Sequence, residues 1–395
     1  MTKARWTLLV AVLVTLVGVA FHFRQTLVLR ITGVRPFIEE RFDGWVRAGA
    51  GEAELDAALR RVYRPSGTGP GSWVYEISQP AAQHEARARE LEAEGGAEGA
   101  AEQWRQAAVL YYVARFPFIG NQAKAEAYRK HIECYLESVK HEEPPLEIVR
   151  IPHRGKEIVG YLRVPRSEVR PPVVVLTGGV DTWKSDIEAP AKAMLAEGMA
   201  AFTFDMPGTG ESAWPLSPDG EGVYSRVLEY LKTRRDLDGD RMAVYLQSFA
   251  GHFAVKLAVL DPNVKAAVNV GGPVHHSFTV EHAQTVDEGM VETIAHAMGE
   301  DPDQPIAEMV AKIEPFSLER QGLLSAPERQ APLLSINGDQ DPLVTIDDLY
   351  VISASGIAQE EWVYAGDGHC APNHAAEHVP RAAAWIRAWL DRVGA

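Results

Sequence analysis

The fold is decided by one stretch, which reads Arg241-Met242-Ala243-Val244-Tyr245-Leu246-Gln247-Ser248-Phe249-Ala250-Gly251-His252-Phe253-Ala254-Val255-Lys256-Leu257-Ala258. An apolar strand runs into a turn of small residues and then into a helix. This pattern predicts a sharp strand-to-helix turn that exposes the hydroxyl of Ser248 at the end of a buried strand. A serine hydroxyl is a weak nucleophile until a base takes its proton, so a histidine and a carboxylate are expected elsewhere in the chain.

Two later loops supply an acid and a base in the order that a serine hydrolase needs. Asp339 and Asp341 follow the glycine turn at Gly338, and His369 closes a second glycine-rich loop. The imidazole would take the proton of Ser248, and the carboxylate would fix the imidazole tautomer. Asp341 is the preferred acid because it lies past the glycine turn, and Asp339 is the rival.

The turn departs from the usual pattern G-x-S-x-G. Leu246 and Ala250 occupy the two glycine positions, and Leu246 is the larger change because its side chain must point away from the tight turn. Considered without the other motifs, Ser248 could equally be a buried serine that caps a helix and takes no part in catalysis. The acid and the histidine in the required chain order favour the nucleophile.

A second strand ends beside the expected site in two glycines. The run Val173–Asp181 is apolar up to Gly178 and Gly179, which allow backbone N–H groups to approach a ligand closely. We expect an oxyanion hole with one N–H from Gly179, or from its neighbour Val180, and one from Phe249, just after the nucleophile.

Composition narrows the class of partner. The 395 residues include 54 acidic and 39 basic side chains, a net charge of −15, with no basic stripe interleaved with aromatic residues, so nucleic acid is not an expected partner. The 13 histidines and two cysteines show no metal-ligand spacing, so no metal and no cofactor are predicted. The expected partner is a small-molecule substrate.

The amino terminus differs in kind from the rest of the chain. Residues 6–23 are almost wholly apolar and would span about 27 Å as a helix, close to the ~30 Å of a bilayer core. We therefore expect a single-pass membrane anchor within residues 1–35. Basic residues flank it on both sides, so charge does not fix its orientation. The alternative is a cleaved signal peptide, since Gly18-Val19-Ala20 resembles a cleavage site.

The rest of the chain divides into two parts. Residues 36–145 carry apolar positions at helical spacing and predict a helical cap domain. Pro144-Pro145 marks the boundary. Residues 146–395 alternate short apolar strands with helices, which predicts an α/β fold with a mainly parallel sheet. Residues 273–330 interrupt this rhythm with extra helical patterns and predict a lid insertion.

Residues 100–391 resemble the FrsA-like α/β-hydrolases, a group that includes 2,6-dihydroxypseudooxynicotine hydrolase and fungal polyketide-shortening hydrolases. The resemblance rests on the runs Ala107–Pro117, Glu126–Lys130, Gly178–Asp181, Phe204–Glu211 and Ser248–Gly251. It implies an α/β-hydrolase fold with a helical amino-terminal domain over the catalytic domain, and a Ser-His-Asp triad at Ser248, His369 and Asp341. Members of the group catalyse different reactions, so the resemblance implies the catalytic residues but not the substrate.

Three functions remain open at this point. The first is a serine hydrolase that cleaves a carboxylic ester of a small, partly aromatic substrate through an acyl-enzyme. The second keeps the triad but cleaves a carbon–carbon bond beside a ketone. The third is a catalytically silent, membrane-anchored binding protein. The intact set of Ser248, Asp341 and His369 favours an enzyme.

Overall fold

The computed structural model describes residues 29, 33–35, 38–302, 304–325 and 331–393. Contacts between Cα atoms divide the chain into two compact units, with the boundary between Val139 and Lys140. The first unit is helical, and the second contains the sheet and every residue of the candidate site.

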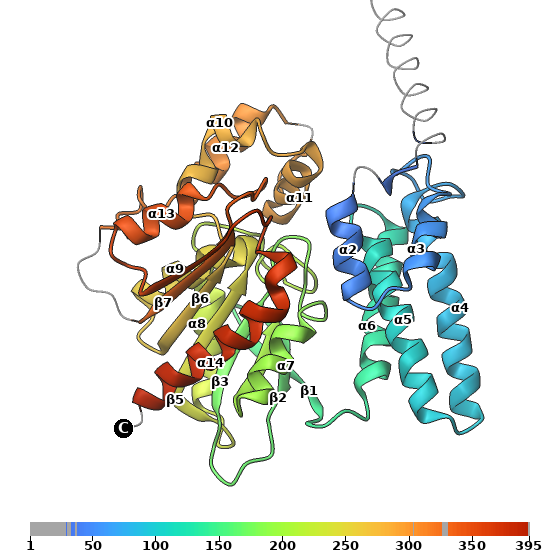
Figure 1. Ribbon diagram of the computed structural model, residues 1–395, viewed down its shortest axis with the longest axis horizontal. Coiled ribbons are helices and arrows are strands. Elements are labelled where there is room, and N and C mark those ends of the chain that lie inside the picture. Colours follow the sequence, from blue (N-terminus) through green and yellow to red (C-terminus); the bar gives the residue numbers. More distant parts are fainter. Residues whose placement is uncertain (1–28, 30–32, 36–37, 303, 326–330, 394–395) are drawn as a thin grey trace, which may run out of the picture. The chain divides into compact units, whose positions relative to one another are not determined.

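The first unit is built from five helices in its described part (Figure 1): α2 (Glu39–Arg47), α3 (Glu52–Leu59), α4 (Trp73–Ala93), α5 (Ala97–Arg115) and α6 (Gln122–Val139). Helices α4, α5 and α6 pack in sequence against one another. The aromatic rings of Trp45, Trp73 and Phe116 meet in its core, with centroids 5.7 Å apart for the two tryptophans. The apolar periodicity of residues 104–139 therefore corresponds to the paired helices α5 and α6.

The second unit is organised around an eight-stranded sheet with the order β1-β2-β4-β3-β5-β6-β7-β8. Its strands are β1 (Leu146–His153), β2 (Lys156–Arg163), β3 (Pro172–Thr177), β4 (Ala200–Phe204), β5 (Asp238–Gln247), β6 (Val264–Val270), β7 (Leu333–Gly338) and β8 (Glu360–Tyr364). Strand β2 pairs antiparallel with β1 and with β4, and the strands from β4 across to β8 are parallel. The apolar runs of the sequence predict strands near residues 146–151, 158–164, 172–177, 199–205, 241–246, 264–270, 331–337 and 360–364. The observed strands lie within two residues of these ranges, apart from the amino-terminal end of β5.

Helices cover both faces of the sheet (Figure 1). Those that pack on it are α7 (Glu188–Ala196), α8 (Glu221–Lys232), α9 (Gly251–Leu260), α13 (Asp347–Ala354) and α14 (Ala375–Val393). Along β3, Val173 and Val175 point into the core shared with α8 and α9, whereas Val174 and Leu176 point into the core shared with α7 and α14. Because successive strand residues face opposite sides, a strand covered on both sides is apolar throughout.

The segment between β6 and β7 carries three short helices, α10 (Val280–Ala283), α11 (Glu288–Met298) and α12 (Ile306–Ile313). They gather at one end of the sheet (Figure 1). The helical pattern over residues 280–298, within the expected insertion, does not form one continuous helix. The helix is interrupted because Asp287 caps a new one, with its carboxylate accepting the N–H of Met290 at 3.0 Å.

The expected single-pass membrane location is contradicted. Within the described ranges, no helix combines the length and the apolar character needed to cross a bilayer. Residues 6–23, on which the expected anchor rests, lie outside the described residues.

Candidate active site

Ser248 lies where β5 ends and α9 begins, at the carboxyl end of a central strand. A short 3-10 turn, Ser248–Ala250, joins the two elements. The backbone φ of Ser248 is +55°, in the left-handed region that a residue with a side chain rarely adopts. Such a conformation costs about 1–3 kcal/mol and is maintained only where the surrounding structure enforces it. The sequence therefore forms the strained turn that exposes a serine hydroxyl.

The two departures from G-x-S-x-G are accommodated by packing. Leu246 is fully buried in the core on the α8 and α9 side of the sheet, so its side chain lies away from the turn. The crowded position is Gly251, where an added Cβ would lie 2.2 Å from Oδ1 of Asn269 and 2.8 Å from Cα of Gly272. The start of α9 and the end of β6 therefore approach each other most closely at Gly251, one residue after Ala250.

Ser248, His369 and Asp341 lie in one hydrogen-bonded row. The Oγ–H of Ser248 donates to Nε2 of His369 at 2.8 Å, and Nδ1–H of His369 donates to Oδ2 of Asp341 at 2.7 Å. A carboxylate only accepts hydrogen bonds, so its position fixes the proton on Nδ1 and leaves Nε2 free to accept. The structure thus brings together three residues that are up to 121 positions apart in sequence.

The surroundings of Asp341 hold its carboxylate ionised. Burial acts to raise the pKa of Asp341, but the charge of His369 and several hydrogen bonds outweigh it, so the pKa is lowered. Backbone N–H groups of Leu343 and Val344 donate to Oδ1 at 2.8 and 3.0 Å, and the amide of Asn337 donates to Oδ2 at 2.9 Å. The carboxylate is fixed in place as well as charged.

The charge of Asp341 acts in turn on His369. Burial by itself lowers the pKa of His369, but the negative charge of Asp341 outweighs burial and raises the pKa well above its usual 6.5. The imidazolium form, which appears when the ring takes a proton from a hydroxyl, is therefore stabilised.

The rival acid, Asp339, lies elsewhere. Its Oδ1 accepts the backbone N–H of Gly366 at 2.7 Å, which ties the loop after β7 to the turn after β8. The structure thus places Asp341, and not Asp339, against the imidazole of His369.

Gly179 and Phe249 meet beside the serine hydroxyl. A Cβ added to Gly179 would lie 2.6 Å from Oγ of Ser248 and 3.4 Å from the backbone nitrogen of Phe249. Only a glycine fits there, and its backbone borders the space above Ser248 together with the N–H of Phe249. The arrangement suits a site for a developing oxyanion.

A buried ion pair holds the loop that carries Gly179. Nζ of Lys184 lies 2.6 Å from Oδ2 of Asp205 and 2.7 Å from Oε2 of Glu211. The backbone N–H of Lys184 donates to Oδ1 of the same aspartate at 2.8 Å. Asp205 thus joins the loop after β3 to the loop after β4.

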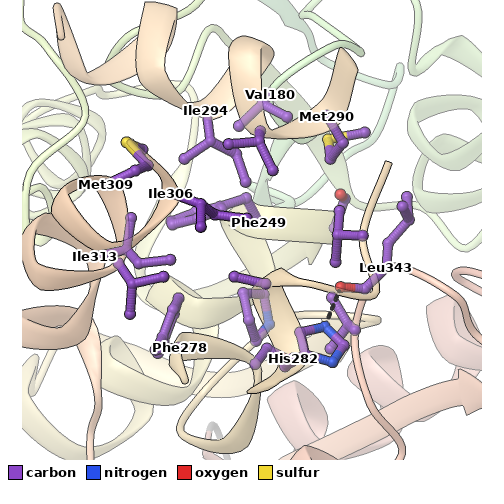
Figure 2. Close-up of a pocket in the computed structure, with 18 of the residues that line it drawn as sticks. Val180, Phe249, Phe278, His282, Met290, Ile294, Ile306, Met309, Ile313 and Leu343 are labelled. Carbon is purple, nitrogen blue, oxygen red and sulfur yellow. Dashed lines mark hydrogen bonds between the residues drawn. The ribbon is translucent and has the colours of Figure 1, made fainter. Parts of the chain in front are cut away.

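Ser248 and His369 open into an apolar pocket (Figure 2), whose space amounts to about 690 Å³ including its opening to solvent. Most of its wall comes from α10, α11, α12 and the segment that precedes them. The lining side chains are mainly aliphatic: Val180, Pro273, Ala283, Val286, Met290, Val291, Ile294, Ile306, Met309, Val310, Ile313, Leu343 and Val344. Phe249 and Phe278 are its two aromatic lining residues among those described. The aliphatic character of this wall suits an apolar ligand.

Two parts of the site were not identified from the sequence. Asn337 bridges both later loops, because its amide donates to Asp341 and its Oδ1 accepts the N–H of Cys370 at 3.0 Å. A polar residue at the carboxyl end of an otherwise apolar strand is the signal that would have indicated it. Within the expected lid insertion, the residues that line the pocket were also not singled out, although the spacing of Met290 and Ile294 is that of one helix face.

Comparison with known proteins adds independent evidence. Residues 56–362 match the model of a family described as esterase FrsA-like. Esterase FrsA of Photobacterium profundum is 25% identical over 329 residues, covering 79% of this chain and 78% of the relative. Esterase FrsA of Vibrio cholerae serotype O1 is 27% identical over 327 residues, covering 78% of each.

Solved structures confirm the predicted fold class. A 2,6-dihydroxy-pseudo-oxynicotine hydrolase matches with a TM-score of 0.73 and 21% identity, over 88% of this chain and 95% of that one. AbyA5 matches with a TM-score of 0.71 and 22% identity, over 90% and 99%. Together with the family match, which spans more than half of the sequence, they confirm the resemblance read from the motifs: the chain belongs to the FrsA-like esterase family of α/β-hydrolases.

Proposed function

We propose that this protein hydrolyses carboxylic esters through an acyl-enzyme on Ser248, with His369 as base and acid and Asp341 as the residue that orients and charges the imidazole. The observation that carries the proposal is the hydrogen-bonded row from Ser248 through His369 to Asp341, with distances of 2.8 and 2.7 Å. The strained backbone of Ser248 and the apolar pocket beside it support the same reading.

In the first half of the reaction, Oγ of Ser248 forms a bond to the ester carbonyl carbon while its proton passes to Nε2 of His369. The carbonyl π electrons move onto the oxygen, where the N–H groups of Phe249 and of Gly179 or Val180 stabilise the negative charge. When the carbonyl re-forms, the bond to the alcohol oxygen breaks, and the imidazolium returns its proton to the departing alkoxide. The acyl group stays on Ser248.

In the second half, solvent water takes the place of the alcohol. His369 removes a proton from the water as its oxygen bonds to the acyl carbon, and the charge again develops at the oxyanion site. Collapse breaks the bond to Oγ of Ser248, which recovers its proton from His369. The products are a carboxylic acid and a free enzyme, so atoms and charge balance with water as the only co-reactant.

Ester cleavage is preferred to carbon–carbon cleavage because of the pocket's chemistry. A carbon leaving group must depart as an enolate or phenolate, which requires hydrogen-bond donors for its oxygen. Among the lining polar side chains, His282 is already engaged, since its Nε2 bonds the carbonyl of Leu343 at 2.9 Å. The apolar wall also shifts the proposed substrate from a partly aromatic compound towards an aliphatic ester.

The pH dependence of p-nitrophenyl acetate hydrolysis tests these roles. Only neutral His369 can accept the proton of Ser248, so kcat/KM is expected to rise with pH as the imidazolium loses its proton. Because Asp341 raises the pKa of His369, the midpoint should lie above 6.5. The measurement is initial rate at low substrate from acid to mildly alkaline pH.

His282 provides the control, since it also lines the pocket but bonds a backbone carbonyl. His282→Gln should leave the midpoint of the profile in place. A profile without a titration step, or a purified and folded protein that hydrolyses no activated ester, would contradict the proposal.

A further inference from the structure

Resting on the proposed function, we infer that the pocket lined by α10, α11 and α12 binds a saturated aliphatic acyl chain of medium length, and that Met309 at its far side sets the accepted length. The ester substrates would then be those of aliphatic acids of roughly hexanoyl to decanoyl size rather than acetyl, aromatic or charged acyl groups.

The chemistry of the wall defines the class of acyl group. None of the described lining residues is an acid, a lysine, an arginine or a carboxamide. A carboxylate on the acyl group would lose its water without gaining a cationic partner, which is strongly unfavourable. Each methylene group that moves from water into the pocket should instead strengthen binding by about fourfold.

The residues nearest the reacting atoms indicate which half of the ester occupies the pocket. Val180 and Phe249 line it, and both flank the expected oxyanion site beside Ser248. The acyl chain is joined to the carbon that bears this oxygen and remains on Ser248 after the alcohol departs. A pocket that borders the oxyanion site is therefore best placed to hold the acyl chain.

The direction of the chain follows from the two ends of the pocket. Leu343 marks the end near the triad, because its N–H donates to Asp341 at 2.8 Å. Figure 2 shows Met309 and Ile313, both from α12, on the side away from Leu343, with Ile306 and Phe249 between them. A chain that starts at Ser248 and extends along the pocket therefore ends against α12.

Met309 is the residue whose size should matter most. Its side chain is 2% exposed and packs into the main core of the second unit, so it forms a fixed boundary and not a surface flap. Shortening it should lengthen the space available to the chain, and enlarging it should shorten that space.

The test is a series of p-nitrophenyl esters from acetyl to palmitoyl, with kcat/KM measured for each. The intact protein should prefer the hexanoyl to decanoyl esters over acetyl by at least about tenfold, as burial of several methylenes implies. A parallel series of acetate esters with alcohols of increasing length should show no comparable rise. A steeper rise with the alcohol than with the acyl chain would overturn the inference.

Substitutions at one position should move the preference in opposite directions. Met309→Trp should lower the octanoyl-to-acetyl ratio of kcat/KM by about tenfold, and Met309→Ala should move the optimum to longer chains. Ile294→Trp repeats the first change at a partly exposed pocket residue, which keeps the test open if a Met309 variant does not fold. Met298 lies on α11 outside the pocket lining, so Met298→Ala and Met298→Trp should leave the ratio as it is.

The outcomes separate this inference from the proposed function. If acetyl esters are hydrolysed but the folded Met309 and Ile294 variants keep the intact protein's chain-length profile, the inference is wrong while the proposed function stands. If no ester of any length is hydrolysed, the proposed function itself is wrong.

Discussion

Ser248→Ala is expected to lower kcat for p-nitrophenyl esters by about 10⁴-fold to 10⁶-fold, the largest effect of any single change in this chain. The methyl side chain cannot form the bond to the carbonyl carbon, and the remaining oxyanion site stabilises attack by water only weakly. The fold should be retained, because the change deletes only the hydroxyl group that bonds His369 at 2.8 Å. Steady-state rates measure the loss of kcat, and a thermal melt on the same preparation shows whether the fold is retained.

Ser225 of α8 provides a matched control, since its partly buried hydroxyl donates to Asp261 at 2.6 Å and lies outside the candidate site. Ser225→Ala should keep the rate of the intact protein. Adding His369→Ala to Ser248→Ala should cost little more than the serine change alone, because the residues of a triad act as a unit. A folded Ser248→Ala protein that turns over esters at an undiminished rate would remove Ser248 from the mechanism.

Asp341→Asn is expected to lower kcat by about 10⁴-fold, comparable with the loss of the acid in other triads. An asparagine can donate as well as accept, so it no longer fixes the proton on Nδ1 of His369. It also removes the charge that raises the pKa of the imidazole. Any residual activity should therefore titrate at a lower pH than that of the intact protein. Rate measurements across pH check both effects.

Asp339→Asn is the control for the Asp341→Asn prediction. Asp339 lies two residues earlier, and its carboxylate bonds Gly366 instead of His369. Its substitution should change kcat by no more than about twofold to threefold, as for most changes near the surface. A greater loss for Asp339→Asn than for Asp341→Asn would reverse the assignment of the acid.

The three residues of the candidate triad could be grouped from the sequence because they follow the carboxyl ends of parallel strands. Ser248 follows β5, Asp341 follows β7 and His369 follows β8, and a parallel sheet brings all of these ends to the same edge. The central strands β3, β4 and β7 could be predicted because both faces of the sheet are covered there, so each of them is a short, fully buried run.

The parts that were not predicted depend on tertiary packing. The tolerance of Leu246 in the turn follows from a core position that no local pattern reveals, and the crowded glycine proved to be Gly251. The pocket wall combines residues from several helices with loops that are distant in sequence, so its aliphatic character emerges only when they are assembled. The expected membrane location rested on the apolar character and length of residues 6–23, and it is contradicted because no helix among the described residues could cross a bilayer.

Labelling with a fluorophosphonate probe tests the central claim, that Ser248 is an activated nucleophile. A fluorophosphonate reacts with a serine whose proton is taken by a neighbouring base and leaves a stable phosphonyl ester. We expect one adduct per chain, mapped by mass spectrometry to the peptide that contains Ser248, absent from Ser248→Ala and slowed in Asp341→Asn. A folded, intact protein that hydrolyses esters but carries no adduct on Ser248, or carries it on another residue, would contradict the account.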